Sequence, residues 1–305
     1  MLTSALAGAA AHLAPPSLDP VAAARWQRVL QPQSPWLHEE VARRMEARLD
    51  WITLQPRTWL HWAPVSGGLL AHENLARRYP KSECFIVEAE AKSALHAMKS
   101  IAKPWWQPAH WRRATPQWHA PPPVGVEMLW ANMALHMSPD PRALLQQWHA
   151  RLAPGGFLMF SCLGPDTMTE LRSAYRSQGW PAPAHAFTDM HDWGDMLLAA
   201  GFAEPVMDME RMRLSYPSAE RLLSELRTLG RNLHRQRGTQ VRGRAWLAQL
   251  HSLLSLSLAA PQSPGRLDLS FEIIYGHAFK ALPRPAALAG GAAVLQDMRG
   301  LRRPR

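Results

Sequence analysis

Glu88 and the glycine pair Gly67 and Gly68 are the residues whose types and spacing best suit the binding of a nucleoside. Glycines in a turn after a strand let the backbone approach a ligand, and a carboxylate about 20 positions later accepts hydrogen bonds from ribose hydroxyls. Pro64 removes one backbone donor from this turn, and a single adjacent glycine pair stands where such a loop usually has several spaced glycines. The pattern therefore predicts either a nucleoside site or a plain turn before a helix.

Asn132 follows an apolar run, 126–131, at a position where its side-chain amide can face a ligand. An asparagine after a strand also commonly caps a turn, because its short side chain hydrogen-bonds the nearby backbone. The sequence leaves both roles open, and turn capping is the more frequent of the two.

The histidines and cysteines do not form the spacing of a metal site. Both cysteines, Cys84 and Cys162, lie within apolar runs typical of buried strands. The histidines that raise the question of a metal are far apart: His136, His185, His191 and His277. No G-x-S-x-G motif marks a serine nucleophile. We therefore expect neither a metal site nor a nucleophilic serine or cysteine.

Strand-like and helix-like segments alternate along the chain, which predicts an α/β fold with a mostly parallel sheet covered by helices on both faces. The predicted strands are the apolar runs at 58–62, 84–88, 126–131, from 157 onward, 206–216 and 271–275. Apolar residues at helical spacing predict helices at 37–49, 69–78, 144–152, 190–197, 222–229 and 246–258. The last two helices predict a small helical lid inserted at about 218–260, and residues 153–156 predict a tight turn before the strand at 157.

The two ends of the 305-residue chain differ from its centre. Residues 1–24 are expected to be a loose or disordered extension without the basic stretch of a secretory signal, which leaves 25–280 as one domain. Residues 281–305 are expected to be a disordered basic tail that supplies +4 of the net charge of +10. No apolar run reaches the roughly 18 residues of a membrane span, and two cysteines in separate strands suit a reducing cytoplasm.

Tryptophan is unusually frequent, with 14 Trp against 7 Phe and 4 Tyr. With a sequence pI near 10.4, this raises the hypothesis of base stacking on RNA. Most tryptophans fall in predicted strands or on apolar helix faces, which favours core packing. A Pro-rich basic stretch holds four without an assigned role: Trp105, Trp106, Trp111 and Trp118. No RNA-recognition signature accompanies them, so nucleic acid is not the expected partner.

Several phrases of the sequence resemble the class I S-adenosylmethionine-dependent methyltransferases, in particular the malonyl-[acyl-carrier protein] O-methyltransferases of biotin synthesis. The generic part is L-x-P-G-G, present as LAPGG at 152–156. The more specific phrases are LQPQSPWLHEEVARRM, LWANMALHM, FLMFSCLGPDTMTELR, HAFTDMHDWGDML and FEIIYGHAFK. The resemblance covers about residues 25–280 and implies a Rossmann-like fold with a seven-stranded, mostly parallel sheet.

For the cofactor, the resemblance implies S-adenosylmethionine. Its methionine end would lie near Gly67 and Gly68, its ribose on Glu88, and its reacting end near Asn132. Two stretches depart from the family's pattern. The first strand usually ends in an acidic residue and a G-x-G-x-G loop, where this chain reads HWAPVSGG at 61–68, and the stretch 28–35 lacks the usual tyrosine.

For the acceptor, the resemblance implies that Asp166, Tyr275 and His277 line the substrate side. The implied reaction is methyl transfer to the free carboxyl of malonyl on acyl carrier protein, an acidic partner that suits the positive net charge. A carboxylate is already a nucleophile, so no general acid or base is expected, and alignment and exclusion of water suffice. The alternative is a non-catalytic protein of the same fold that binds a carrier or partner protein and has lost cofactor binding.

Overall fold

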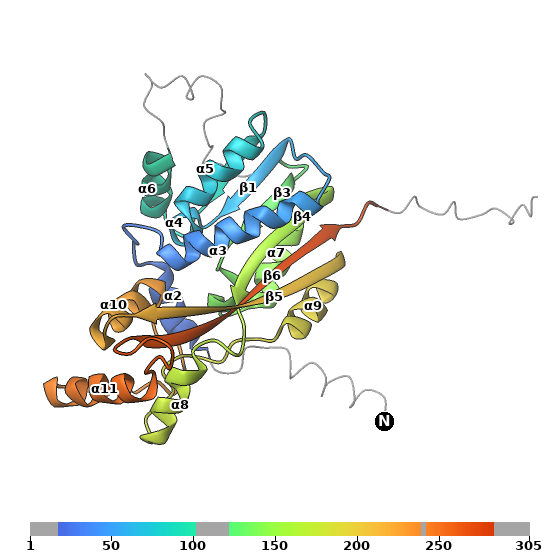
Figure 1. The fold of residues 1–305 in the computed structure, drawn as a ribbon. Coiled ribbons are helices and arrows are strands. Elements are labelled where there is room, and N and C mark those ends of the chain that lie inside the picture. The colour runs from blue at the N-terminus through green and yellow to red at the C-terminus, as the bar shows by residue number, and fades with distance from the viewer. Residues whose placement is uncertain (1–17, 102–121, 239–241, 284–305) are drawn as a thin grey trace, which may run out of the picture.

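The structure is a computed structural model that describes residues 18–101, 122–238 and 242–283. Its centre is a six-stranded sheet in the order β2-β1-β3-β4-β6-β5. Strands β1 to β4 are parallel, and β6 runs antiparallel to both of its neighbours. The strands are β1 (Thr58–Trp62), β2 (Glu83–Val87), β3 (Val126–Ala131), β4 (Leu152–Leu163), β5 (Phe202–Tyr216) and β6 (Leu267–Lys280). This arrangement is the Rossmann-like α/β fold that the sequence predicts (Figure 1).

Helices fill the connections between the strands. In the first half they are α2 (Pro20–Gln27), α3 (Trp36–Ala47), α4 (Pro64–Gly67), α5 (Leu69–Arg78) and α6 (Ala91–Ile101). In the second half they are α7 (Pro141–Arg151), α8 (Thr169–Ser177), α9 (Met190–Ala199), α10 (Ala219–Leu229) and α11 (Arg244–Ser257). Two short 3₁₀ helices lie at Arg48–Trp51 and Leu135–Met137. Along the chain, helices α10 and α11 come between β5 and β6, and α11 packs against α10 and α8 at one end of the sheet (Figure 1).

Alternating side chains of the strands build one apolar layer on each face of the sheet, because successive residues of a strand point to opposite sides. Trp59 and Trp130 pack on the face covered by α3, where Val41 and Met45 are fully buried. On the other face, strand residues such as Leu60 pack with Trp148 of α7 and Trp193 of α9. Burying each such side chain contributes about 1.5–3 kcal/mol, so the helix layers on both faces stabilise the sheet.

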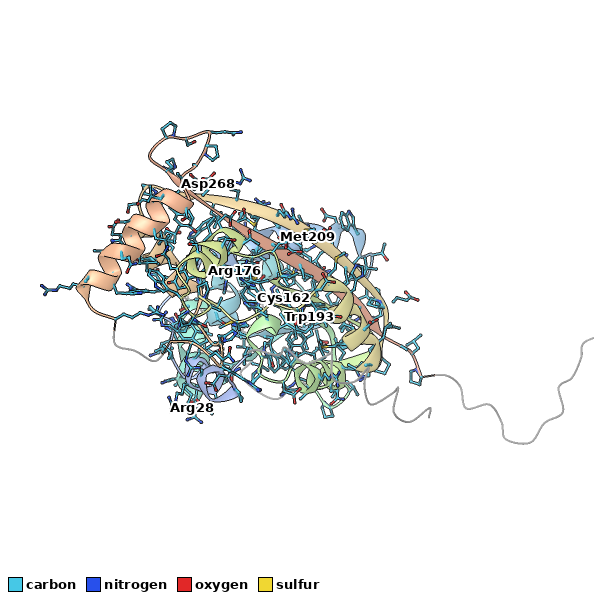
Figure 2. All side chains as sticks on the ribbon, turned by 90° about the horizontal axis from the view of Figure 1, so that it is seen from below. Arg28, Cys162, Arg176, Trp193, Met209 and Asp268 are labelled. Carbon is cyan, nitrogen blue, oxygen red and sulfur yellow. The ribbon has the colours of Figure 1, made fainter. Side chains whose placement is uncertain are left out.

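Cys84 and Cys162 are buried and free, on β2 and β4 with two strands between them, as the predicted topology requires. Figure 2 shows Cys162 and Trp193 within the packed side chains rather than at the surface. These two cysteines belong to the core.

The structure corrects two details of the sheet. The described residues form six strands rather than the seven expected. The stretch Ala153–Gly156 is a bulge inside β4 rather than a turn before it, since Val126 and Met128 of β3 pair with Leu152 and Phe157 of β4. Gly155 has φ +78°, a left-handed conformation that glycine adopts without strain, which explains why a turn-like sequence occurs within a strand.

The N-terminal boundary also differs from the expectation. Residues 20–24 belong to α2 rather than to a loose extension, because Asp19 caps that helix and Leu18 and Ala23 pack against Leu233. Residues 1–17, most of the tail at 284–305 and the four unassigned tryptophans between 102 and 121 lie outside the described residues.

Candidate functional site

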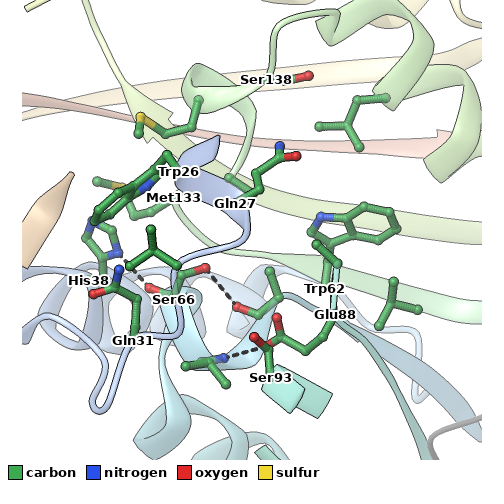
Figure 3. Close-up of a pocket in the computed structure, with 18 of the residues that line it drawn as sticks. Trp26, Gln27, Gln31, His38, Trp62, Ser66, Glu88, Ser93, Met133 and Ser138 are labelled. Atoms are coloured by element: carbon green, nitrogen blue, oxygen red, sulfur yellow. Dashed lines mark hydrogen bonds between the residues drawn. The ribbon is translucent and has the colours of Figure 1, made fainter. Parts of the chain in front are cut away.

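A pocket of about 560 Å³ opens at the carboxyl ends of β1, β2 and β3. Trp62 ends β1, Glu88 follows β2 and Met133 follows β3, and all three line this pocket (Figure 3). Residues of α2, among them Trp26 and Gln27, form the opposite wall. The strand order reverses between β1 and β3, which is the place where doubly wound sheets bind ligands. The volume is that of a small-molecule or cofactor site.

Glu88 is held in the pocket wall by the loop that follows β1. Its Oε1 accepts a hydrogen bond from the Val65 N–H at 2.8 Å (Figure 3). Among the described residues its Oε2 has no hydrogen-bond partner, so that oxygen is available to a ligand donor. Burial raises the pKa of Glu88 to about 7, although the bond from Val65 acts in the opposite direction. The carboxyl group predicted from sequence is therefore part of the pocket, and ligand hydroxyls that donate hydrogen bonds to it would favour its ionised form.

The loop between β1 and α5 is a single short helical turn, α4, with a left-handed residue on each side. Ala63 has φ +49° and Gly68 has φ +132°. Its backbone closes its own hydrogen bonds: the Gly67 N–H donates to Ala63 O at 2.8 Å and the Gly68 N–H to Pro64 O at 2.9 Å. The Cβ of Ala63 makes the left-handed conformation cost about 1–2 kcal/mol. Gly67 and Gly68 thus shape the turn and do not present open N–H groups to the pocket.

Asn132 lies beneath this loop instead of lining the pocket. Its Nδ2 donates to the backbone oxygens of Gly67 and His38, the latter at 2.8 Å. Its Oδ1 accepts from Ser161 Oγ at 2.6 Å, and the side chain is 1% exposed. Because every polar group of the amide is used, Asn132 ties the loop to α3 and β4. Its position at the end of a strand was predictable, and its effect on the site is to fix the loop.

The three residues expected on the acceptor side, Asp166, Tyr275 and His277, do not line the pocket. Asp166 forms an exposed ion pair with Arg211. Tyr275 is buried, and its hydroxyl donates to Glu210 at 3.3 Å. His277 pairs with the middle of β4, away from the strand's carboxyl end. None of these three side chains therefore lies with Glu88 among the residues that line the pocket.

His38 of α3 lines the pocket and was not singled out from the sequence. Its Nδ1 lies 2.7 Å from Ser66 O, and since a carbonyl only accepts, Nδ1 carries the proton and Nε2 is an acceptor (Figure 3). Burial lowers the pKa of His38 to about 4, which keeps the ring neutral. The signal in the sequence was a polar residue on the apolar face that also carries Leu37, Val41 and Met45.

Two further histidines, His61 and His72, lie side by side in the core. The rings of His61 and His72 stack with an interplanar angle of 5°, and their Nδ1 atoms are 3.4 Å apart. Burial, and then the neighbouring His72, lowers the pKa of His61 well below its usual value. The described residues contain no group of three or more His, Cys, Asp or Glu side chains suited to a metal ion.

The strand order, the two helix layers and the pocket at the reversal point define a Rossmann-like protein with a cofactor-sized site. No protein-family model matches the chain. Curated relatives do match it. A malonyl-[acyl-carrier protein] O-methyltransferase of Gallionella capsiferriformans is 36% identical over 85% of this chain and 89% of its own. Enzymes with the same name from Laribacter hongkongensis and Halorhodospira halophila are each 33% identical, over 82% and 88% of this chain and 84% and 90% of their own. The chain belongs to the malonyl-[acyl-carrier protein] O-methyltransferase family.

Solved structures are more distant. A putative methyltransferase from Bacillus halodurans is 15% identical and covers 77% of this chain and 98% of its own, with a TM-score of 0.48. Within the described part of the chain, no helix is both long and apolar enough to cross a membrane.

Proposed function

We propose that the chain transfers the methyl group of S-adenosylmethionine to the free carboxylate of a malonyl group carried by acyl carrier protein, a step of biotin precursor synthesis. The observation that carries this proposal is Glu88, a carboxylate in a cofactor-sized pocket at the end of β2 whose Oε2 has no hydrogen-bond partner among the described residues. The names of the relatives supply the acceptor and the type of reaction.

The lining of the pocket fits this cofactor. Glu88 Oε2 would accept from the ribose hydroxyls, and the apolar walls at Trp62 and Met133 would pack on the uncharged parts of the ligand. Two carboxylates, Glu88 and Asp140, line the pocket with one guanidinium, Arg151, which suits a ligand with cationic groups and one carboxylate. The amino-acid end would meet side chains such as Gln27 and Gln31 rather than the loop, whose backbone groups are used internally.

Bound S-adenosylmethionine supplies an electrophilic methyl group on a sulfonium leaving group. The malonyl carboxylate oxygen forms the new bond to this carbon while the carbon–sulfur bond breaks, and its electron pair stays on sulfur. No proton moves, so the products are a methyl ester and S-adenosylhomocysteine and no general base is needed. What the chain contributes is alignment and exclusion of water, both of which speed displacement.

The loop geometry favours a second candidate function, a non-catalytic protein that binds a carrier or partner protein. Ala63 stands at a left-handed position that suits glycine, and the loop backbone offers few free donors. This candidate differs from the first in one measurable property, because it binds the carrier without transferring a methyl group.

The test is to incubate the purified chain with S-adenosylmethionine and malonyl-acyl carrier protein and to record the intact mass of the carrier. We expect one methyl group on the malonyl carrier and an equal amount of S-adenosylhomocysteine. An acetyl carrier, which lacks the free carboxylate, is the matched control and should stay unmodified. Unmodified malonyl carrier would overturn the proposal, and binding of that carrier in the same preparation would favour the non-catalytic alternative.

A further inference from the structure

Four exposed arginines adjoin or contact residues that line the pocket, and they are called the rim arginines below: Arg25, Arg28, Arg227 and Arg231. Arg25 and Arg28 flank the lining residues Trp26 and Gln27. Arg227 precedes the lining residues Thr228 and Leu229 at the end of α10. The guanidinium carbon of Arg231 lies 5.0 Å from the centre of the Trp26 ring. These residues come from two segments that are about 200 positions apart in the sequence.

Direct contacts make those two segments one surface. Leu18 and His234 form an antiparallel bridge, and the Asp19 N–H donates to Leu233 O at 2.7 Å. Arg237 pairs with Asp19 at 2.6 Å. The position of α2 relative to the end of α10 is therefore fixed by backbone and charged contacts, and the rim arginines of the two segments belong to one surface.

The positive charge of the rim arginines is largely uncompensated. All four are exposed. Within the described residues, Arg25, Arg227 and Arg231 form no ion pair with a carboxylate. Arg28 reaches Glu90 only at 3.9 Å, with 74% of its side chain exposed, and Figure 2 shows it at the outer margin of the molecule. An exposed pair of this length contributes little, so Arg28 also keeps its attraction for an external anion.

Exposed aliphatic side chains accompany the rim arginines. Val21, Val29 and Leu30 on α2 and the turn after it are 57%, 49% and 42% exposed. A surface that combines guanidinium groups with aliphatic side chains suits a folded protein partner, because arginine and apolar residues are enriched in protein interfaces. This combination favours a protein partner over nucleic acid, whose phosphate backbone is bound mainly through charge.

We propose that the rim arginines dock the acidic carrier protein, so that its acyl group enters the pocket between α2 and the end of α10. This inference rests on the proposed function, since it takes the carrier as the source of the substrate. The acyl group must reach the carboxyl ends of β1 and β3 from outside, and the rim arginines lie beside the lining residues that α2 and the end of α10 contribute. Opposite charge then speeds encounter and orients the carrier.

The test compares a carrier-bound substrate with a small one. Arg25→Glu combined with Arg227→Glu reverses two rim charges, and neither of these side chains forms an ion pair within the described residues. The matched control is Arg57→Glu combined with Arg176→Glu, two exposed arginines that are not adjacent in the sequence to any residue lining the pocket. For each protein we would measure kcat/KM on malonyl-acyl carrier protein and on malonyl-pantetheine at several salt concentrations.

We expect the rim variant to lose about tenfold or more in kcat/KM on the carrier substrate, a loss typical of removed steering, and to lose much of its salt dependence. Its activity on malonyl-pantetheine should stay the same, and the control variant should match the wild type on both substrates. Equal loss on both substrates, or no loss on the carrier, would overturn the docking surface. Salt-dependent RNA binding by the wild type that the rim variant loses, with its activity on the carrier unchanged, would also overturn it.

The binding of fluorescently labelled malonyl carrier, measured by anisotropy, separates this inference from the proposed function. If the wild type methylates neither substrate, the proposed function fails, while weaker carrier binding by the rim variant than by the control would still support the docking surface. Equal carrier binding by the two variants would contradict it.

Discussion

Replacing Glu88 with glutamine should change how the stability of the protein depends on pH. In the folded chain, desolvation raises the pKa of this partly buried carboxyl from 4.5 to about 7. A group with a raised pKa binds its proton more tightly when folded than when unfolded, so folding becomes less favourable as pH rises through this interval. The difference between the two pKa values corresponds to a destabilisation of the folded state by about 3 kcal/mol. This destabilisation is present in full above pH 7 and absent below about pH 4.5.

Glutamine keeps the carbonyl oxygen that accepts from the Val65 N–H and removes the ionisation. The free energy of unfolding of Glu88→Gln relative to the wild type should therefore increase by about 3 kcal/mol between pH 4.5 and pH 8. Urea unfolding at several pH values in this range measures it. Glu90→Gln is the control, since the Glu90 side chain is 39% exposed and should give a much smaller change. A pH-independent difference for Glu88→Gln would refute the assignment of Glu88 as a desolvated carboxyl with a raised pKa.

Three further substitutions probe the loop and the core beneath it. Ala63→Gly should raise the free energy of unfolding by about 0.5–1 kcal/mol, because glycine relieves the strain at φ +49° and loses part of that gain to chain entropy; an unchanged or lower urea midpoint would contradict this. Asn132→Ala should lower the same quantity by about 2–4 kcal/mol, since it leaves two backbone oxygens and the Ser161 hydroxyl without their buried partner; a loss below about 1 kcal/mol would argue against its role as a tie. His61→Leu should remove part of the stability loss that the wild type shows below pH 6.5, because the folded pKa of this buried histidine is lowered and the unfolded chain takes up the proton as pH falls. Parallel pH–stability curves of the two proteins would contradict that prediction.

The sequence predicts the parts of the fold that local patterns determine. The strand Thr58–Trp62, the helix Leu69–Arg78 and the strand Val126–Ala131 have the predicted bounds, because short apolar runs and helical spacing are properties of neighbouring residues. The extension of β5 and β6 beyond their predicted ends was missed. These strands pair along almost their whole length, but polar residues interrupt the apolar pattern at the ends of β6, and exposed residues recur along β5, so apolar runs alone do not predict that pairing.

In the candidate site, too, local sequence patterns predict some features and not others. Glu88 could be found because its position directly after a strand puts it at the edge of the sheet. The orientation of the Asn132 amide could not, since its partners His38 and Ser161 are 94 and 29 residues away. The separation of Tyr275 and His277 from the pocket likewise depends on the register of β6 against β4, which no local pattern specifies.

The most direct test of the central claim is a calorimetric titration of the purified chain with S-adenosylmethionine at pH 8, where Glu88 is ionised. We predict saturable binding at one site, weakened about tenfold or more by Glu88→Ala, because a hydrogen bond to a charged group contributes about 1.5–3 kcal/mol. If circular dichroism shows that the chain is folded and no binding is detected at millimolar cofactor, the claim that this pocket holds the methyl donor is contradicted.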